Sequence, residues 1–277
     1  MKQRIITGVC MAAVFIPIVI FSEYIVYPIA VSLLCVMAMF ELFRVIGMLR
    51  CLPLSIPAFV FGAFFPLYAF FVSDEAEYLK NVLAAVFVYL LYAFAVAVFM
   101  RGKINFSSVS AAVISVLYLT VSFTAMSALR YADGGEYYVY LIFISAWVCD
   151  IFAYFTGRLF GRHKLIVEIS PKKTVEGALG GIVFVAGAFA LYGFIVGRIY
   201  SLFPNYPVLV AAGVVAAVIS QIGDLIASLI KREHEVKDYS NIFPGHGGVM
   251  DRFDSVLAVA PVVFAGTQLT GYISFFI

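Results

Sequence analysis

Charged residues are scarce in this sequence. They make up 12% of its 277 residues, about half of the roughly 25% found in soluble proteins. A chain that is poor in charge and rich in apolar residues is neither a disordered linker nor a nucleic-acid-binding protein, so the composition excludes these two classes. The formal net charge of +2 is too small to indicate a partner. We therefore expect no nucleic acid among the partners of this protein.

Cysteine is also rare, and its spacing does not suit a metal site. The four cysteines, Cys10, Cys35, Cys51 and Cys149, lie far apart in the sequence, which excludes a disulfide-rich scaffold and a thiolate metal centre. Three of them lie within apolar runs, where cysteine acts as a small hydrophobic side chain. No small-residue cleavage site follows the basic start of the chain, so we expect an uncleaved first span rather than a signal peptide.

Apolar residues are what the sequence has in excess. They make up 64% of the chain, against roughly 45–50% in soluble proteins, and the mean hydropathy is +1.05. A soluble fold of this size could not hide so much apolar surface from water. The composition therefore indicates that lipid surrounds most of the chain.

Apolar runs close to the length needed to cross a bilayer recur along the sequence. They are too long and too uniformly apolar for the strands of a membrane barrel, so we expect helices. We predict an all-α, polytopic integral membrane protein with about nine transmembrane helices. These cover residues 5–21, 24–43, 54–72, 79–100, 108–128, 137–157, 178–197, 206–230 and 255–277.

The basic residues predict the orientation of these helices. If the N-terminus is cytoplasmic, all but three of the 18 lysines and arginines fall on the inner side, the exceptions being Lys80, Arg130 and Arg198. Cytoplasmic loops of membrane proteins carry such an excess of positive charge. We therefore expect the N-terminus inside and the C-terminus outside, in the plasma (inner) membrane.

The basic residues also divide the chain into two regions. Residues 1–136 have short loops, and we expect them to form a scaffold of transmembrane helices. Residues 137–277 contain two long cytoplasmic segments, 158–177 and 231–254, which hold more positive charge than orientation requires. We expect a catalytic region there, with its active site facing the cytoplasm.

Two carboxylates lie inside predicted spans of this second region. Asp150 and Asp224 each precede the cytoplasmic end of their span by about two helical turns. An ionisable group inside the membrane is costly and indicates a functional site. The alternative is that each carboxylate pairs with a nearby arginine, such as Arg158, and only holds helices together.

Further carboxylates follow in the second cytoplasmic segment. Asp251 and Asp254 are three residues apart, so on a helix they share a face. Carboxylates next to basic residues suit Mg²⁺ that bridges phosphates. Upstream, Pro244-Gly245 predicts a turn, and the pair Gly247-Gly248 lets the backbone approach a ligand closely. For His246 we favour hydrogen bonding to phosphate or to the loop backbone over metal binding.

The first cytoplasmic segment offers a candidate anion site. Ser170-Pro171 is typical of a helix N-cap followed by the first helical residue. Lys172, Lys173 and Thr174 would then lie at a helix N-terminus, where free N–H groups favour an anion. The alternative is that these lysines serve only the orientation of the protein and meet lipid headgroups.

A longer pattern covers residues 228–254 without a gap. It contains Ser228-Leu-Ile-Lys-Arg232, then Lys237-Asp-Tyr-Ser240, then Phe243-Pro-Gly-His-Gly-Gly-Val-Met-Asp-Arg-Phe-Asp254. It resembles the signature of phosphatidate cytidylyltransferases, also called CDP-diacylglycerol synthases. The upstream segments Gly-Arg-x-x-Gly and Ser-Pro-Lys-Lys-Thr-x-Glu-Gly resemble the same family, whereas residues 1–136 resemble it only in their apolar spans.

The resemblance implies an enzyme of phospholipid biosynthesis. In this family CTP and phosphatidate give CDP-diacylglycerol and pyrophosphate. The resemblance further implies dependence on Mg²⁺, with one metal ion, two, or an added monovalent cation left open. It also implies a homodimer and contact with membrane lipids.

The same resemblance suggests roles for individual residues. Asp224 and Asp251 resemble the metal carboxylates, and Asp150 and Asp254 are assigned to the metal site or to orienting basic groups. Lys172, Lys173, Lys231, Arg232 and Lys237 resemble phosphate-binding groups, of which Lys173, Lys231 and Arg232 are assigned to catalysis. Ser228, Thr174, Asp238, His246, Gly247, Gly248 and Arg252 are assigned to substrate binding.

Three other functions stay open. A CTP-dependent lipid-alcohol kinase of the dolichol or phytol type has a similar C-terminal half but transfers the γ-phosphoryl group. A CDP-alcohol phosphotransferase needs an Asp-Gly-x-x-Ala-Arg motif, whereas the only Asp-Gly here is Asp133-Gly134 on the predicted outer side. A cation or proton transporter could use Asp150 and Asp224, but transporters usually show repeated halves, and this sequence has none.

Overall fold

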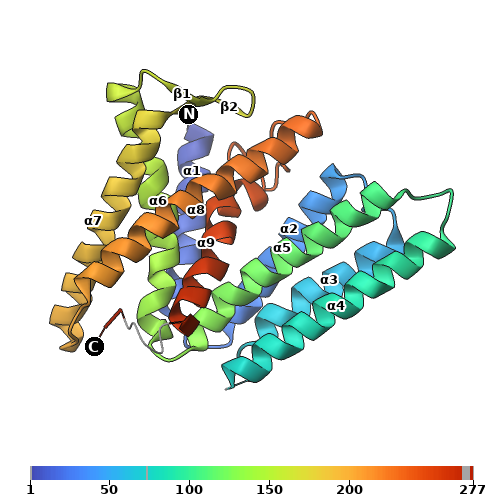
Figure 1. The fold of residues 1–277 in the computed structure, drawn as a ribbon, viewed down its shortest axis with the longest axis horizontal. Helices are drawn as coiled ribbons and strands as arrows, with labels where there is room; N and C mark the ends of the chain where they lie inside the picture. Colours follow the sequence, from blue (N-terminus) through green and yellow to red (C-terminus); the bar gives the residue numbers. More distant parts are fainter. Residues whose placement is uncertain (1, 73, 270–274, 277) are drawn as a thin grey trace. The chain divides into compact units, whose positions relative to one another are not determined.

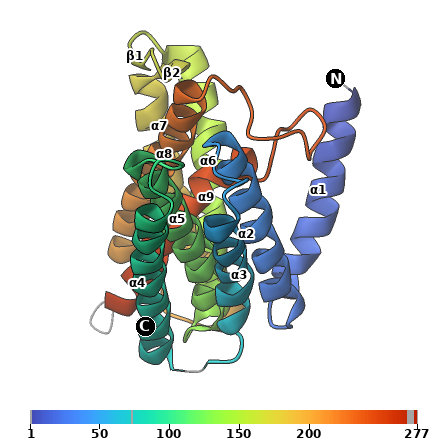
Figure 2. The same cartoon turned by 90° about the vertical axis from the view of Figure 1, so that its right-hand side faces the viewer.

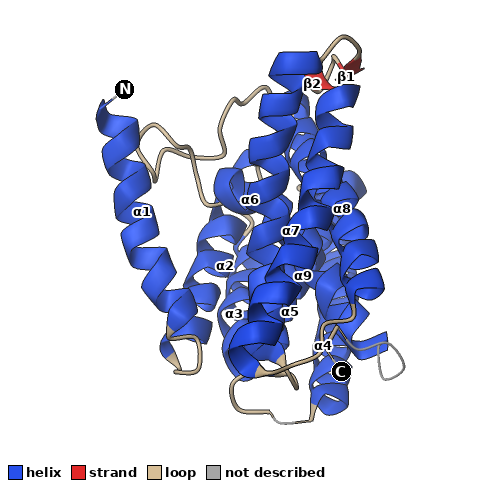
Figure 3. Ribbon diagram, turned by 90° about the vertical axis from the view of Figure 1, so that its left-hand side faces the viewer, coloured by secondary structure: helices blue, strands red, loops and turns tan. Residues whose placement is uncertain are grey.

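Helices dominate the protein. A computed structural model describes residues 2–72, 74–269 and 275–276, and Figure 3 shows that only one short hairpin in them is β-structure. The elements of the described residues are α1 (Lys2–Ile20), α2 (Val26–Val45), α3 (Leu52–Tyr68), α4 (Glu75–Phe99), α5 (Phe106–Tyr131), α6 (Gly135–Phe160), β1 (Lys164–Ile166), β2 (Ser170–Thr174), α7 (Val175–Tyr200), α8 (Tyr206–Glu233) and α9 (Met250–Leu269).

The predicted all-α, polytopic class is confirmed. Six of the described helices, namely α2, α4, α5, α6, α7 and α8, contain a segment long and apolar enough to cross a membrane. Shorter apolar helical stretches, in α1 and at α3, correspond to two more predicted spans. The ninth predicted span, 255–277, corresponds to most of α9, while residues 270–274 and 277 lie outside the described part of the chain.

The chain forms two compact units. Unit 1 comprises Met1–Asp133 and Glu233–Phe253, and unit 2 comprises Gly134–Arg232 and Asp254–Ile277. The division after residue 133 lies close to the boundary of the two regions expected from the sequence, 1–136 and 137–277. The segment 233–253, however, packs with unit 1. The division of function between the two sequence regions stays a prediction.

Unit 1 is built around α5. This helix packs against α2, α3 and α4, and α2 and α3 lie side by side (Figures 1 and 2). Leu119, Phe123 and Leu129 of α5 are fully buried. The hydroxyl groups of the buried Tyr27 and Tyr89 donate to the carbonyls of Met126 and Leu54, at 3.1 and 3.2 Å. Such bonds are needed because lipid cannot satisfy a polar group.

Unit 2 is built on the close packing of α6 against α7. Glycines of α7 make this approach possible, because a Cβ at Gly177 would lie 2.6 Å from the Ala153 carbonyl oxygen of α6. One turn further along α7, a Cβ at Gly181 would lie 3.0 Å from Cys149 Sγ. Small residues bring membrane helices together in this way. The β1–β2 hairpin connects the two helices (Figure 3).

The predicted helix start at Ser170-Pro171 is wrong. These residues begin β2, which pairs antiparallel with β1 through Lys164–Thr174 and Ile166–Ser170. The pairing across the hairpin supplies backbone partners that a helix would otherwise provide. The N-cap of α7 is Thr174, whose hydroxyl oxygen accepts from the Gly177 N–H at 3.1 Å. Lys172 and Lys173 therefore lie in a strand, and the helix N-terminus does not explain anion binding by them.

The loop before α9 belongs to unit 1 and contains the predicted turn. The His246 N–H donates to the Phe243 carbonyl at 2.8 Å, and Gly245 has a φ of +79°. This is the geometry of a type II turn, with Pro244 at its second position and glycine at its third. The turn predicted at Pro244-Gly245 is confirmed. The tip of the loop lies beside α1 (Figure 2), where the Thr7 hydroxyl donates to the Pro244 carbonyl at 3.1 Å.

Candidate active site

Asp224 and Lys173 form an ion pair at the centre of the candidate site in unit 2. Lys173 Nζ on β2 lies 2.6 Å from Asp224 Oδ2 on α8, and each side chain is 26% exposed. Ser228, one turn further along α8, donates its hydroxyl to Asp224 Oδ1 at 3.3 Å. Asp224 is thus paired with a lysine. Arg158, suggested from the sequence as a partner, instead donates to the Tyr154 hydroxyl at 3.1 Å.

A cavity of about 350 Å³ surrounds this ion pair. It brings together five residues predicted for the site, which are Asp150 of α6, Lys172, Lys173 and Thr174 of β2, and Asp224 of α8. The rest of its lining includes the apolar residues Ala153, Leu165 and Ala178 and the polar residues Arg158 and Gln221. Cations next to apolar groups suit a ligand that has both a phosphate and a hydrocarbon part.

Asp254 adds a third carboxylate to the surroundings of Asp224. It lies in the part of α9 that belongs to unit 2, and its charge interacts with those of Asp224, Asp150 and Lys231. Carboxylates that face one another repel, and a bound cation removes this repulsion. The donor set therefore fits a hard divalent ion.

Protein groups alone do not form a complete metal cage. Within residues 2–72, 74–269 and 275–276, no three His, Cys, Asp or Glu side chains lie close enough together to hold a metal ion. Mg²⁺ usually takes only one or two carboxylates and leaves its other positions to water and substrate phosphates. Asp224, with Asp150 or Asp254 nearby, matches that requirement.

The remaining predicted residues of unit 2 lie at the end of α8. Lys231 interacts with Asp254, as stated above. Arg232 Nε donates to the Ile169 carbonyl at 3.3 Å, which ties the end of α8 to the connection between β1 and β2. Both residues thus interact with segments that form the site: the charge of Lys231 interacts with that of Asp254, and Arg232 forms a hydrogen bond with Ile169.

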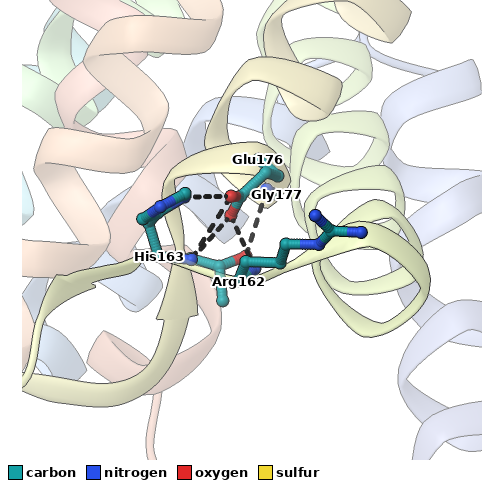
Figure 4. Close-up of polar contacts among 5 residues, drawn as sticks. Arg162, His163, Glu176 and Gly177 are labelled. Atoms are coloured by element: carbon teal, nitrogen blue, oxygen red, sulfur yellow. Dashed lines mark hydrogen bonds and ion pairs between the residues drawn. The ribbon is translucent and has the colours of Figure 1, made fainter.

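Glu176 ties the start of α7 to the residues that follow α6. It lies in the first turn of α7, before the apolar run, and accepts hydrogen bonds from the backbone N–H groups of Arg162 and His163 at 3.1 and 3.2 Å. The His163 ring Nδ1 lies 2.6 Å from Glu176 Oε1 (Figure 4). Its own N–H, the His163 ring and these neighbouring N–H groups lower the pKa of Glu176 to about 2. The sequence alone assigns no role to Glu176.

A second cavity, of about 360 Å³, lies in unit 1. All of its lining residues belong to the signature, between positions 237 and 252. Five of them were predicted to bind substrate, namely Lys237, Asp238, His246, Gly247 and Arg252, and Asn241 and Gly245 complete the lining. The cavity offers cationic, donor and acceptor groups on a compact loop. Such a surface suits a polar, anionic ligand.

Asp251 closes this loop onto the start of α9. Its side chain is buried, and Oδ2 accepts from the N–H groups of Tyr239 and Gly248, at 2.7 and 3.0 Å. The Asp251 carboxylate therefore stabilises the conformation of this loop. Its assignment as a metal ligand stays a prediction that depends on the signature.

Glu41 is a buried carboxylate that sequence reasoning missed. It lies in α2 and accepts hydrogen bonds from Val249, Met250 and Ser240, all in the signature. A signal was present, because Glu41 lies inside the predicted span 24–43, just as Asp150 and Asp224 lie inside theirs. An intramembrane carboxylate indicates a functional site by the same argument wherever it occurs.

Comparison with known proteins settles the family. The model of a family described as "Cytidylyltransferase family" matches residues 2–270. The chain belongs to the cytidylyltransferase family. The resemblance inferred from residues 228–254 is thereby confirmed, and it extends to the N-terminal helices, where the sequence alone had offered only apolar spans.

Relatives of similar length support this membership of the cytidylyltransferase family. The chain is 35% identical to the phosphatidate cytidylyltransferase of Bacillus subtilis (strain 168) over 272 residues, which cover 95% of this chain and 96% of that protein. It is 33% identical to that of Staphylococcus haemolyticus (strain JCSC1435) over 270 residues, covering 95% of this chain and 97% of that protein. That of Staphylococcus epidermidis is 32% identical over 268 residues, with the same coverage.

Proposed function

We propose that this protein is a phosphatidate cytidylyltransferase, which converts CTP and phosphatidate to CDP-diacylglycerol and pyrophosphate. Near-full-length relatives bear that name, and the observation that carries the proposal is the Lys173–Asp224 pair inside a cavity that is partly apolar and partly cationic. A lipid with a phosphate headgroup matches both properties of this cavity.

The reaction explains why the site needs charge more than a base. A phosphate oxygen of the lipid attacks the α-phosphorus of CTP, a new P–O bond forms, and the bond to the β-phosphate bridging oxygen breaks to release pyrophosphate. The nucleophile is already an anion, so no strong general base is needed. The main barrier is bringing two highly negative partners together, and cationic groups lower it.

The proposed roles follow from the groups in the two cavities. Lys172 and Lys173 bind phosphate oxygens in the cavity of unit 2, while Lys237, His246 and Arg252 bind polar parts of a substrate in the cavity of unit 1. Ser228 orients the Asp224 carboxylate. Lys231 and Arg232 supply further positive charge at the end of α8.

Mg²⁺ is the proposed cofactor, with Asp224 as its principal ligand in unit 2 and Asp150 and Asp254 as supporting carboxylates. When bound, Mg²⁺ would neutralise phosphate charge and polarise the phosphorus–oxygen bonds. For Asp251 of unit 1, the proposed metal role rests on the signature. The Lys173 ammonium holds Asp224 in place and neutralises it until a cation and substrate arrive.

We further propose that the enzyme acts in the cytoplasmic membrane as a homodimer, with its N-terminus and active site on the cytoplasmic side. The distribution of lysine and arginine supports this orientation. Cytoplasmic CTP could then reach the polar loops directly, while phosphatidate would enter from the surrounding leaflet. The homodimer rests on the family resemblance.

The test uses purified protein in detergent with Mg²⁺, phosphatidate and CTP labelled separately at the α- and γ-phosphorus. The organic phase is then counted. Label from the α position alone is expected, because a cytidylyl group is transferred. Label from the γ position alone, with an isoprenoid alcohol offered in parallel, would identify a lipid-alcohol kinase. No transfer from either position would overturn the proposal and favour the transporter.

A further inference from the structure

Glu41 is fully buried, and burial of a carboxylate has to be compensated. The side chain is 0% exposed, within a helix that packs against α3 and α5. Moving a carboxylate out of water costs several kcal/mol unless hydrogen bonds replace its hydration. The hydrogen-bond partners of Glu41 therefore indicate its structural role.

Three hydrogen-bond donors to Glu41 belong to the signature loop, which comprises residues 239–250. Oε1 accepts from the Val249 N–H at 2.9 Å and Oε2 from the Met250 N–H at 2.8 Å. The Ser240 hydroxyl also donates to Oε1. One carboxylate of α2 thus joins the two ends of a loop about 200 positions away in the sequence.

The two backbone donors lie at the N-terminus of α9. Met250 is the first residue of α9, and Val249 directly precedes it. The first N–H groups of a helix have no acceptor within it, and the helix dipole makes this end favourable for a negative charge. Glu41 therefore acts as an N-cap supplied by another helix, and it fixes where α9 begins.

The glycine pair of the signature is explained by two carboxylates. A Cβ at Gly248 would collide with the Glu41 carboxylate, and a Cβ at Gly247 would lie 2.7 Å from Asp251 Oδ2. Gly247 also has a φ of +83°, which favours glycine. The close approach expected from Gly247-Gly248 is therefore used by Glu41 and Asp251.

Glu41 and Asp251 hold neighbouring positions of the loop. Asp251 accepts from the N–H groups of Tyr239 and Gly248, and Glu41 binds the next residue in each case, Ser240 and Val249. Arg44, one turn beyond Glu41 on α2, donates to the Tyr239 carbonyl. The end of α2 is therefore hydrogen-bonded to the loop whose residues line the cavity of unit 1.

We infer that Glu41 is a positioning residue for the reaction: it holds the signature loop and the start of α9 in the conformation that binds substrate. This inference rests on the proposed function insofar as the loop is a substrate-binding loop. Glu41 itself touches the loop backbone and the Ser240 hydroxyl, so it acts through residues such as His246, Asp251 and Arg252.

The experiment compares Glu41→Ala and Glu41→Gln with Met39→Ala. Met39 is equally buried in the same helix, and a Cβ at Gly62 of α3 would lie 3.8 Å from Met39 Cε, so replacement of Met39 tests a general loss of packing. Glutamine keeps the size of the side chain and one oxygen acceptor but loses the charge. Hydrogen exchange of the 239–252 peptide, melting temperature, kcat, and the KM values for CTP and Mg²⁺ are measured for each variant in detergent.

Glu41→Ala is expected to speed exchange of the Val249 and Met250 amides at least about tenfold, because a charge-assisted acceptor is lost. It should also lower kcat/KM for CTP at least tenfold. Glu41→Gln should fall between Glu41→Ala and the unmodified protein in both respects. Met39→Ala should lower the melting temperature without selective exchange in the loop.

Two results would overturn the inference. The first is that the loop of Glu41→Ala exchanges no faster than the loop of Met39→Ala. If Glu41→Ala does not fold, Glu41→Gln takes its place in this comparison. The other is faster exchange accompanied by unchanged kcat/KM. Since exchange reports on the loop whichever phosphate of CTP reacts, a failure here is distinguishable from a failure of the proposed cytidylyl transfer.

Discussion

The Lys173 ammonium lies 2.6 Å from the Asp224 carboxylate, and this contact joins the β1–β2 hairpin to α8 within unit 2. With both side chains about three-quarters buried, neither charge is fully hydrated, so each depends on the other. The pair has two consequences for activity, one for each partner. A cation that binds Asp224 competes with Lys173, and an anion that binds Lys173 competes with Asp224.

Asp224→Asn should reduce turnover at least about 100-fold. Asparagine keeps the shape of the side chain but cannot neutralise a divalent ion, and it leaves Lys173 without its counter-charge. The α-labelled CTP assay measures the loss, and the melting temperature shows whether the variant is folded. Turnover near that of the unmodified protein would remove Asp224 from the site.

Lys173→Ala should raise KM for CTP or phosphatidate about tenfold or more, because a phosphate-binding cation is lost from the cavity. Lys80→Ala is the matched control: Lys80 is exposed, near the start of α4, and lies on the predicted outer side. Its replacement should leave both constants unchanged. If Lys173→Ala behaves like Lys80→Ala, the alternative that this lysine only orients the protein is correct.

The helices of this fold could be predicted from the sequence because lipid imposes a simple pattern. A run of about 20 apolar residues has few other structures available, so the all-α class and the approximate positions of the described helices followed directly. Candidate site residues could be proposed because the signature 228–254 and the segment 170–177 each place several of them close together in sequence. Asp150 and Asp224 were recognisable as carboxylates inside apolar spans. The turn at Pro244-Gly245 was predictable for the same local reason.

Contacts between distant segments were not predictable in this way. Ser170-Pro171 has the local preferences of a helix start, yet pairing with β1 makes it a strand, and nothing in its own residues signals that partner. Glu41 is recognisable as an intramembrane carboxylate, but its role depends on Val249 and Met250, far along the chain. Thr174 is the N-cap of α7 because β2 ends at this residue and α7 begins directly after it.

Removal of divalent ions with EDTA should abolish turnover, and added Mg²⁺ should restore it, because the carboxylates around Asp224 fit a hard cation that also binds phosphate oxygens. Asp150→Asn and Asp254→Asn should raise the Mg²⁺ concentration needed for half-maximal activity several-fold. Both variants are titrated with Mg²⁺ at saturating CTP. Full turnover in EDTA, or unchanged titrations for both variants, would contradict these metal roles.

Gly177→Ala should destabilise unit 2 by about 2 kcal/mol or more, because the added Cβ would lie 2.6 Å from the Ala153 carbonyl oxygen and push α6 away from α7. Gly187→Ala, in the same helix, is the control, since a Cβ there meets nothing within 4 Å. Melting temperatures in detergent should fall for the first variant and stay level or rise slightly for the second. Equal behaviour of the two would mean that this helix contact is not tight.

Glu176→Gln should lower the melting temperature at pH 7, and this difference from the unmodified protein should disappear in acid. In the folded protein the pKa of Glu176 is lowered from 4.5 to about 2, so its charge adds stability above about pH 4.5. That stability is lost as the pH falls toward 2, where the carboxylate becomes protonated in the folded state too. Glu168→Gln, at an exposed position in the same segment, should show no such dependence. A Glu176→Gln difference that is the same at pH 7 and pH 3 would mean that the bonds to Arg162 and His163 do not depend on the charge of Glu176.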